Sequence, residues 1–137
     1  MEEVLNRIKI LIQKEGFNAS ELKTLLTDFL KNHLKGMHID NYIGDYPTFM
    51  EPVYLGNGVK IGDDVLIGPN VYIGGKSEIS NYVELSNAII FENVKLGNNV
   101  KLENCIVAKD SLIADNVHEK NCILFGITDS KSDKISF

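Results

Sequence analysis

A six-residue recurrence is the feature of this sequence that most constrains its fold. Three consecutive segments, VKIGDD, VLIGPN and VYIGGK, begin at Val59, Val65 and Val71, and each has Gly at its fourth place. A single amphipathic strand would continue its two-residue alternation, whereas here Gly, Asn, Asp or Pro interrupts every apolar triplet. The chain is therefore expected to turn a corner about every six residues, as a solenoid does when each turn buries its apolar side against the next.

The repeats predict a mainly β fold, a parallel β-helix, over residues 53–126. Three short strands make one triangular turn, so this region corresponds to about four turns. One residue of each strand points inward, and these residues are Leu55, Ile61, Ile67, Ile73, Ile79, Leu85, Ile90, Leu96, Leu102, Val107 and Ile113. Because all of them are aliphatic, the interior is expected to be filled, and any binding site must lie on an outer face, at a subunit boundary or at an end.

The repeats after Val83 are one residue shorter per turn, and their alignment stacks three asparagines at one corner. These are Asn87, Asn104 and Asn121. Asn tolerates turn dihedrals and can hydrogen-bond to its own copies along a stack, so we interpret the column as structural, with a ligand role as the alternative. Cys105 and Cys122 fall beside this column and are expected to be buried thiols rather than a disulfide.

The segments outside the repeats have different patterns. Residues 1–36 predict a helical hairpin, because apolar residues recur at helical spacing and Asn18 and Glu21 form a capping-box pair before the second helix. Residues 37–52 contain Pro47 and Pro52 and no clear period, which predicts a packed connector. Residues 127–137 read as a polar C-terminal tail.

Composition excludes several classes of function. The net charge is −5 and only 14 residues are Lys or Arg, which disfavours binding to nucleic acid. No signal peptide is apparent, and no apolar run approaches the roughly 20 residues that a membrane span needs, so no membrane association is expected. We therefore expect a cytoplasmic protein.

The repeats resemble the left-handed parallel β-helix family of hexapeptide-repeat proteins. Within it, GNGVKIGDDVLIGPNVYIG, NAIIFENVKLG and NCIVAKDSLIADNV are similar to the C-terminal domain of sugar-1-phosphate nucleotidyltransferases of the mannose-1-phosphate guanylyltransferase type. Left-handed winding is implied by this resemblance alone. Those enzymes carry an N-terminal nucleotide-binding domain with a Gly-rich phosphate loop, where this chain has the predicted helical hairpin. The resemblance therefore implies a role in assembly or regulation, without a cofactor and with a separate catalytic subunit as a candidate partner.

The alternative function is that of an acetyl-CoA-dependent acyltransferase, an activity of many hexapeptide-repeat proteins. His118 is the candidate general base, because it alone among the three histidines lies in the repeats, and Glu119 is the candidate to orient it. The structural interpretation of His118 is a solvated surface residue. A zinc site of the kind found in this fold needs three histidine ligands, which the repeats do not contain, so no metal is expected.

Glu119 is unusual in a second respect, because it aligns with the inward Leu85 and Leu102. Burial of an unpaired carboxylate is costly. Either the solenoid loosens after Val117, which we favour, or Glu119 is paired.

One outer face is predicted to be apolar and to need a cover. Its residues are Tyr54, Tyr72, Ile89, Ile106 and Ile123. Strands that are apolar on both sides belong to sheets covered on both faces. The helical hairpin is long enough to cover this face, but we favour an interface in a homo-oligomer, and the family resemblance implies a trimer.

Overall fold

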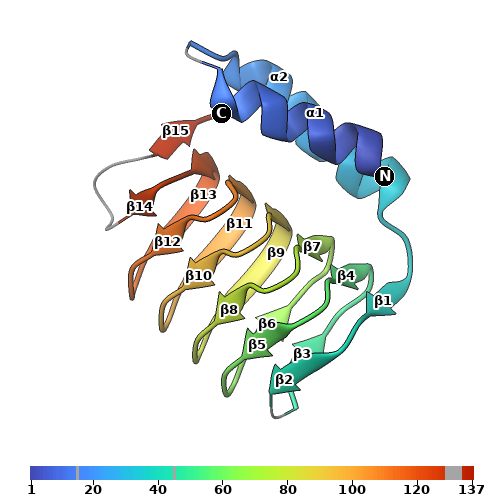
Figure 1. Cartoon of the computed structure of the whole chain (residues 1–137), viewed down its shortest axis with the longest axis vertical. Helices are drawn as coiled ribbons and strands as arrows, with labels where there is room; N and C mark the ends of the chain where they lie inside the picture. Colours follow the sequence, from blue (N-terminus) through green and yellow to red (C-terminus); the bar gives the residue numbers. More distant parts are fainter. Residues whose placement is uncertain (15, 45, 129–133) are drawn as a thin grey trace.

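The computed structural model contains two N-terminal helices and a β-solenoid of about five turns (Figure 1). It describes residues 1–14, 16–44, 46–128 and 134–137. The predicted mainly β class and the N-terminal helices are confirmed, and left-handed winding stays a prediction from the family resemblance. Neither described helix is long and apolar enough to cross a membrane.

The helical segment consists of α1 (Glu2–Gln13), α2 (Ala19–Asp28) and the π-helical η1 (Phe29–His33). The strands are short except for three that run around a corner of the solenoid. In chain order they are β1 (Met37–Ile39), β2 (Tyr42–Gly44), β3 (Thr48–Phe49), β4 (Val53–Leu55), β5 (Val59–Ile61), β6 (Leu66–Ile67), β7 (Val71–Ile73), β8 (Glu78–Ile79), β9 (Glu84–Ile90), β10 (Lys95–Leu96), β11 (Lys101–Val107), β12 (Leu112–Ile113), β13 (His118–Leu124), β14 (Ile127–Thr128) and β15 (Lys134–Ser136).

Each solenoid strand pairs in parallel with the equivalent strand of the next turn. One sheet has the order β1-β4-β7-β9-β11-β13-β15, with β3 and β6 joined to its other half through β9, and a second sheet has the order β14-β12-β10-β8-β5-β2. The strands β9, β11 and β13 belong to two outer faces, because their first residues pair on one side of a corner and their last residues on the other. These three strands therefore join two faces of the prism.

The interior of the solenoid is filled by aliphatic columns. All eleven of the inward positions predicted from the sequence are buried, and they lie in one hydrophobic cluster. In each turn the same side-chain types stack on their equivalents 17 or 18 residues away, for example Ile67 on Leu85 and Val53 on Val71. The described part of the chain therefore encloses a packed core and presents its chemistry outward.

The predicted connector contains the first turn of the solenoid, which the sequence pattern did not reveal. Its strands β1, β2 and β3 pair in parallel with β4, β5 and β6. Ile39 keeps an aliphatic residue in this layer, but aromatic side chains stand at two other positions. Tyr42 and Phe49 pack on the core and meet edge to face with ring centroids 5.9 Å apart. The hexapeptide signature is absent because a terminal layer has a neighbour on one side only and tolerates larger, less regular side chains.

The predicted polar tail also contains strands. Strand β14 adds to β12, and β15 pairs antiparallel with β13, so that the last turn is closed by a strand of opposite direction. An unpaired strand edge invites association, and an antiparallel strand covers part of it. The middle of the predicted tail, residues 129–133, lies outside the described residues.

The corner asparagines form hydrogen bonds along the solenoid axis, as the structural interpretation predicts. Asn70 Nδ2 donates to Asn87 Oδ1 at 2.9 Å, and Asn104 Nδ2 donates to Asn121 Oδ1 at 2.7 Å. All four residues have positive φ, a conformation that Asn adopts more readily than most residues. Asn therefore suits the corner in two ways. Its backbone accepts the positive φ, and its side-chain amide hydrogen-bonds to the adjacent turn.

The two cysteines stack on adjacent turns as free thiols. Cys105 and Cys122 are both buried, with their Sγ atoms 3.7 Å apart. The hydrogen bond to Cys122, together with burial, raises the pKa of the Cys105 thiol above its usual range. The pair fills core volume as small apolar side chains do.

The helical hairpin covers the apolar outer face of the solenoid. In Figure 1 the helices lie across the ends of β4, β7, β9, β11 and β13. Their apolar side chains form one cluster with the face, whose members include Leu5, Ile8, Leu22, Leu26, Phe29, Tyr72, Ile89, Ile106 and Ile123, with Tyr54 packed against it. Of the two predicted covers, the structure has the hairpin.

The interface predicted from Tyr54, Tyr72, Ile89, Ile106 and Ile123 is thus internal to one chain. The three isoleucines are 0% exposed and Tyr72 is 7% exposed, so these side chains are not available to a second subunit. The sequence left both covers open because the length of the hairpin and the width of the face allow either one. The structure places the hairpin on this face because the leucines of both helices also need an apolar surface to pack against.

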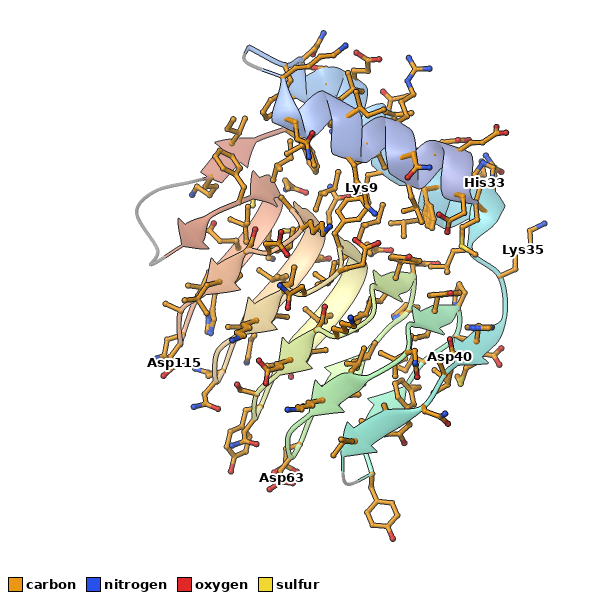
Figure 2. All side chains as sticks on the ribbon, in the orientation of Figure 1. Lys9, His33, Lys35, Asp40, Asp63 and Asp115 are labelled. Carbon is orange, nitrogen blue, oxygen red and sulfur yellow. The ribbon has the colours of Figure 1, made fainter. Side chains whose placement is uncertain are left out.

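The helical hairpin has a side-chain cap at the start of α2 and an ion pair from α1 to the solenoid. The side chain of Asn18 caps α2 by accepting hydrogen bonds from the backbone N–H groups of Ser20 and Glu21, which confirms the predicted cap. Lys9 points from α1 towards the solenoid, where its Nζ lies 2.7 Å from Glu92 Oε1 and 5.2 Å from the centre of the Phe91 ring (Figure 2). This lysine combines an ion pair with a cation–π contact beneath the helix.

Tyr72 is the buried phenol at the centre of this contact. Its ring stacks on Tyr54 at 4.8 Å and meets Phe29 edge to face at 5.6 Å. Burial, reinforced by the negative charge of Glu92, raises the pKa of Tyr72 well above its usual value. A phenol whose folded-state pKa is raised stabilises the fold below the unfolded-state pKa, and that stabilisation is lost as the pH rises above it.

We predict that Tyr72 makes the protein sensitive to alkali. Above pH 10, the usual pKa of tyrosine, the free energy of unfolding of the native chain should fall by up to about 1.4 kcal/mol per pH unit more than that of Tyr72→Phe. Chemical unfolding followed from neutral pH to pH of about 11 checks this. The 60% exposed Tyr82 supplies the control, because Tyr82→Phe should behave as the native chain does. Equal alkaline slopes for all three proteins would contradict the prediction.

Candidate functional site

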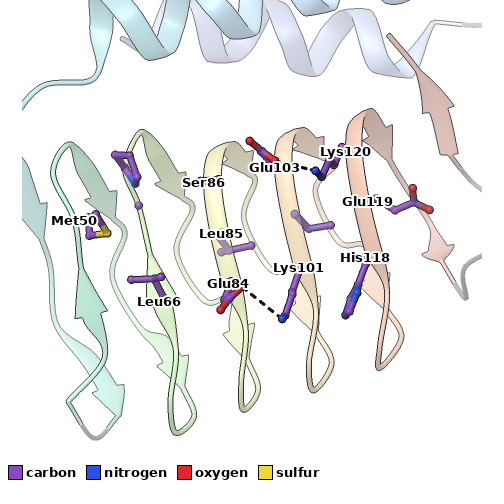
Figure 3. Close-up of a pocket in the computed structure, with 13 residues that line it drawn as sticks. Met50, Leu66, Glu84, Leu85, Ser86, Lys101, Glu103, His118, Glu119 and Lys120 are labelled. Carbon is purple, nitrogen blue, oxygen red and sulfur yellow. Dashed lines mark ion pairs between the residues drawn. The ribbon is translucent and has the colours of Figure 1, made fainter.

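The outer groove is a hollow of about 520 Å³ on the face formed by β3, β6 and the first halves of β9, β11 and β13 (Figure 3). Its apolar end is formed by Met50, Leu66 and Pro69, and its polar end contains Lys101, Glu103, His118 and Lys120 among others. A hollow of this volume is in the range of ligand and peptide pockets. Because the core is filled, a partner can reach the solenoid only from outside, and this face offers it a recess with an apolar end.

Two rows of side chains cross the outer groove along the solenoid axis. The period of 17 residues sets Glu84, Lys101 and His118 in one row, and Ser86, Glu103 and Lys120 in the other. Opposite charges on adjacent turns form ion pairs, with 3.6 Å from Lys101 Nζ to Glu84 Oε2 and 3.6 Å from Lys120 Nζ to Glu103 Oε2 (Figure 3). All four side chains are about half exposed or more, so these pairs contribute little to stability and are free to exchange partners.

His118 lies at the C-terminal end of the first row and points outward. Its Nε2 atom is 3.0 Å from the carbonyl oxygen of Asn99. Since a carbonyl accepts hydrogen bonds only, Nε2 carries a proton, and in the neutral ring Nδ1 is the basic nitrogen. This arrangement suits a general base, although in the described part of the chain no second titratable side chain is hydrogen-bonded to the ring.

Glu119 does not orient His118, because consecutive residues of a strand point to opposite sides. Glu119 pairs with Leu102 in the strand register, and its carboxylate oxygens both lie 3.3 Å from Lys134 Nζ. The predicted loosening after Val117 is wrong, since β13 continues the register of β11 through Leu124. Lys134 belongs to β15, a segment that the sequence marked only as a polar tail, and it supplies the charge that makes an inward carboxylate tolerable.

Each of the three histidines contacts different residues, and none contacts another histidine in the part of the chain that the structure describes. His33 faces Asp28 at 3.5 Å, and His38 faces Asp40 at 3.4 Å and stacks on the Tyr54 ring. Within residues 1–14, 16–44, 46–128 and 134–137, no group of three or more His, Cys, Asp or Glu side chains is placed to hold a metal ion.

Sequence reasoning named two residues that line this hollow, His118 and Glu119, as site candidates and missed the others. Met50 escaped notice because it lies in the predicted connector. Ser86, Glu103 and Lys120 escaped notice because each reads as an ordinary polar residue before a corner. The alignment at 17 residues would have found the second row, since it places opposite charges at Glu103 and Lys120.

Comparison with known families gives the identity of the solenoid. The sequence matches the family described as the GMPPB C-terminal domain over residues 49–133, which is more than half of the chain. The chain belongs to this family. GMPPB is mannose-1-phosphate guanylyltransferase beta, so the resemblance drawn from the repeats is confirmed. No curated protein matches the sequence.

The family match includes most of the solenoid, and with it the residues that line the outer groove. The first two strands and the helical hairpin lie before residue 49 and thus outside the matched range. The helices that cover the apolar face are therefore an addition to the GMPPB C-terminal domain as the match delimits it. All residues named in the outer groove, from Met50 to Lys120, lie inside it.

We predict that Glu119 makes the native protein less stable than a variant with leucine at this position. Glu119→Leu extends the leucine column of the preceding turns and should raise the free energy of unfolding by about 1 kcal/mol, because an ion pair with one largely buried partner is replaced by apolar packing. Chemical unfolding at neutral pH measures the change. Glu103→Leu, on the exposed side of the adjacent strand, is the control and should change stability by less than about 0.5 kcal/mol. A Glu119→Leu protein less stable than the native one would show that the Lys134 ion pair outweighs apolar burial.

Proposed function

We propose that this protein is an assembly or regulatory subunit that docks a sugar nucleotidyltransferase of the mannose-1-phosphate guanylyltransferase type through the outer groove. Membership of the GMPPB C-terminal domain family supports the class of partner. The observation that carries the proposal is the groove itself, in which an apolar recess adjoins two rows of exposed, exchangeable charges. A recess that excludes water beside a polar rim is the arrangement of protein–protein contacts.

The two ends of the groove contribute differently to such a contact. Met50 is 47% exposed although it is a large apolar side chain, so its burial by a partner is favourable. Lys101 and Lys120 already have carboxylate neighbours at 3.6 Å, and an acidic group of a partner would compete for them at small cost. The apolar end supplies affinity, and the charged end supplies orientation and specificity.

Charge reversal in the groove tests this function against a matched site elsewhere on the solenoid. Lys101→Glu should weaken binding to the catalytic chain of a mannose-1-phosphate guanylyltransferase from the same genome by at least about tenfold, because it places like charges in the rim. The control is Lys95→Glu on the other sheet, where Lys95 is 59% exposed and lies 3.5 Å from Glu78. Calorimetry measures both affinities, and light scattering reports whether the complex contains one copy or several.

Two results would overturn the docking proposal. One is absence of binding between the native chain and the catalytic chain. The other is an equal loss of affinity in the Lys95 and Lys101 variants, which would mean that overall charge and not the groove decides binding. Met50→Asp gives a further check, because it should weaken binding without removing any ion pair.

A second candidate function is acyl transfer from acetyl-CoA, and the Asn99 contact favours it. The carbonyl group holds the ring of His118 with Nε2 protonated, which leaves Nδ1 to accept a proton from an attacking hydroxyl or amine. We expect an acyltransferase to give saturable acetyl-CoA binding in calorimetry and acetyl transfer that is lost in His118→Ala and retained in His38→Ala. No binding at millimolar acetyl-CoA would exclude this function.

A further inference from the structure

A second hollow, here called the hairpin groove, runs between the helical hairpin and the asparagine corner. It has a volume of about 520 Å³. One wall consists of the amide side chains of Asn70, Asn87 and Asn104, and the other is formed by Thr27, Leu30, Lys31 and Leu34, with Pro52 at the end. The repeat alignment left a ligand role for this asparagine column as the alternative to its structural one, and it assigned no role to the helical wall. Its size is within the range of pockets that bind small molecules and short peptide segments.

The asparagine column is interrupted where it faces the groove. Asn70 bonds to Asn87, and Asn104 bonds to Asn121, but no hydrogen bond joins Asn87 to Asn104 in the part of the chain that the structure describes. The amide of Asn87 therefore has a free donor, and the amide of Asn104 has a free acceptor, one turn apart. Unmatched amide groups side by side bind water or a ligand that offers the complementary pair.

The helical wall carries one charge and an unusual backbone. Leu30 and Lys31 belong to η1. π-Helical turns are rare in proteins, and those that occur are often found at functional sites. Lys31 is the one charged residue among those that line the groove, and its ammonium group has no ion-pair partner among the described residues. The protein carries a net charge of −5, so an unpaired cation beside amide donors marks this groove as a local site for a negative group.

We propose that the hairpin groove binds an extended acidic peptide segment. In an extended chain the N–H and C=O of one residue point to the same side. One such residue can accept from Asn87 Nδ2 and donate to Asn104 Oδ1, and so complete the interrupted column. A neighbouring Asp or Glu side chain then pairs with Lys31.

The remaining lining fits the same ligand. Leu30 and Leu34 are 8% and 4% exposed, and with Pro52 they form the apolar part of the groove, which suits an apolar side chain of the peptide. A nucleic acid would meet a single cation in an acidic protein, which is too little positive charge. A neutral polyol would satisfy the asparagines but leave Lys31 without a partner.

This site is independent of the outer groove. The two grooves lie on different faces, and no residue lines both. Peptide binding at the hairpin groove is therefore tested with no catalytic partner present.

NMR spectroscopy of the asparagine side-chain amides tests the proposal directly. The probe is the blocked peptide acetyl-Leu-Asp-Leu-Gly-amide, and its matched control has Asn in place of Asp. We expect saturable shifts of the Asn87 and Asn104 amide signals at millimolar peptide, and affinity for the control peptide about tenfold lower because the charged hydrogen bond to Lys31 is lost. Lys31→Gln should lower affinity for the acidic peptide by the same factor.

The variant Lys35→Gln supplies the matched control on the protein. Lys35 is exposed in the same segment and points away from the body of the protein (Figure 2), so its removal should leave peptide affinity within about twofold. Thr27→Val, which removes a hydroxyl from the same wall, should weaken binding less than Lys31→Gln. Thr27 in α2 and Lys35 just after η1 are both exposed, so both substitutions should leave the amide spectrum of the free protein otherwise unchanged.

Three outcomes of the peptide titrations, and a fourth with the variants, would overturn the proposal. The first three are the absence of shifts at the highest peptide concentration, equal shifts with both peptides, and equal shifts with sodium acetate alone, which would indicate an adventitious ion only. Shifts that persist in Lys31→Gln and vanish in Lys35→Gln would likewise place the site elsewhere.

Discussion

Parallel stacking of aliphatic side chains in register is the interaction on which the rest of this structure depends. Each turn repeats the inward positions of the turn before it, so that Ile67 lies under Leu85 and Ile73 under Ile90. A slip of one residue in any strand would send its inward side chain to solvent and its polar neighbour into the core. Corner residues at positive φ, such as Asn87 and Asn104, prevent that slip, because they set the place where each strand turns.

The long strands β9, β11 and β13 connect the core to both candidate sites. Before the asparagine corner, their outward residues form the rows of the outer groove. At the corner, the Asn87 and Asn104 side chains line the hairpin groove. Beyond the corner, their outward residues Ile89, Ile106 and Ile123 are buried under the helices. One strand thus presents charged, amide and apolar side chains in succession, and the turn at the corner sends each kind to a different surface.

Sequence periodicity predicted the parts of the structure that repeat and missed the parts that end a repeat. The inward aliphatic positions and the asparagine column were predictable because each is supported by copies one turn away. Residues 37–52 were not, because the first layer uses Tyr42 and Phe49 in place of aliphatic residues. Glu119 was misjudged for a related reason, since its partner Lys134 lies in β15, which follows no repeat.

The outer groove shows the same division. His118 was identified from the sequence as the histidine of the repeats, but its contact with the Asn99 carbonyl depends on the path of the preceding corner. Met50 lines the groove because β3 pairs with β6, and no local sequence pattern predicts that pairing. A recess on a solenoid forms where adjacent turns differ in side chains or path. Sequence periodicity shows only the positions that the turns have in common, so it does not predict such a recess.

The sequence by itself determined the solenoid, its solid interior and the family to which it belongs, because a repeated pattern of apolar and corner residues is compatible with few other folds. Tertiary structure alone decided what covers the face of Tyr72, Ile89 and Ile106. A hairpin of the same chain and a second subunit satisfy the same apolar pattern. The choice depends on whether the leucines of α1 and α2 reach that face, which is a matter of distance between elements far apart in the chain.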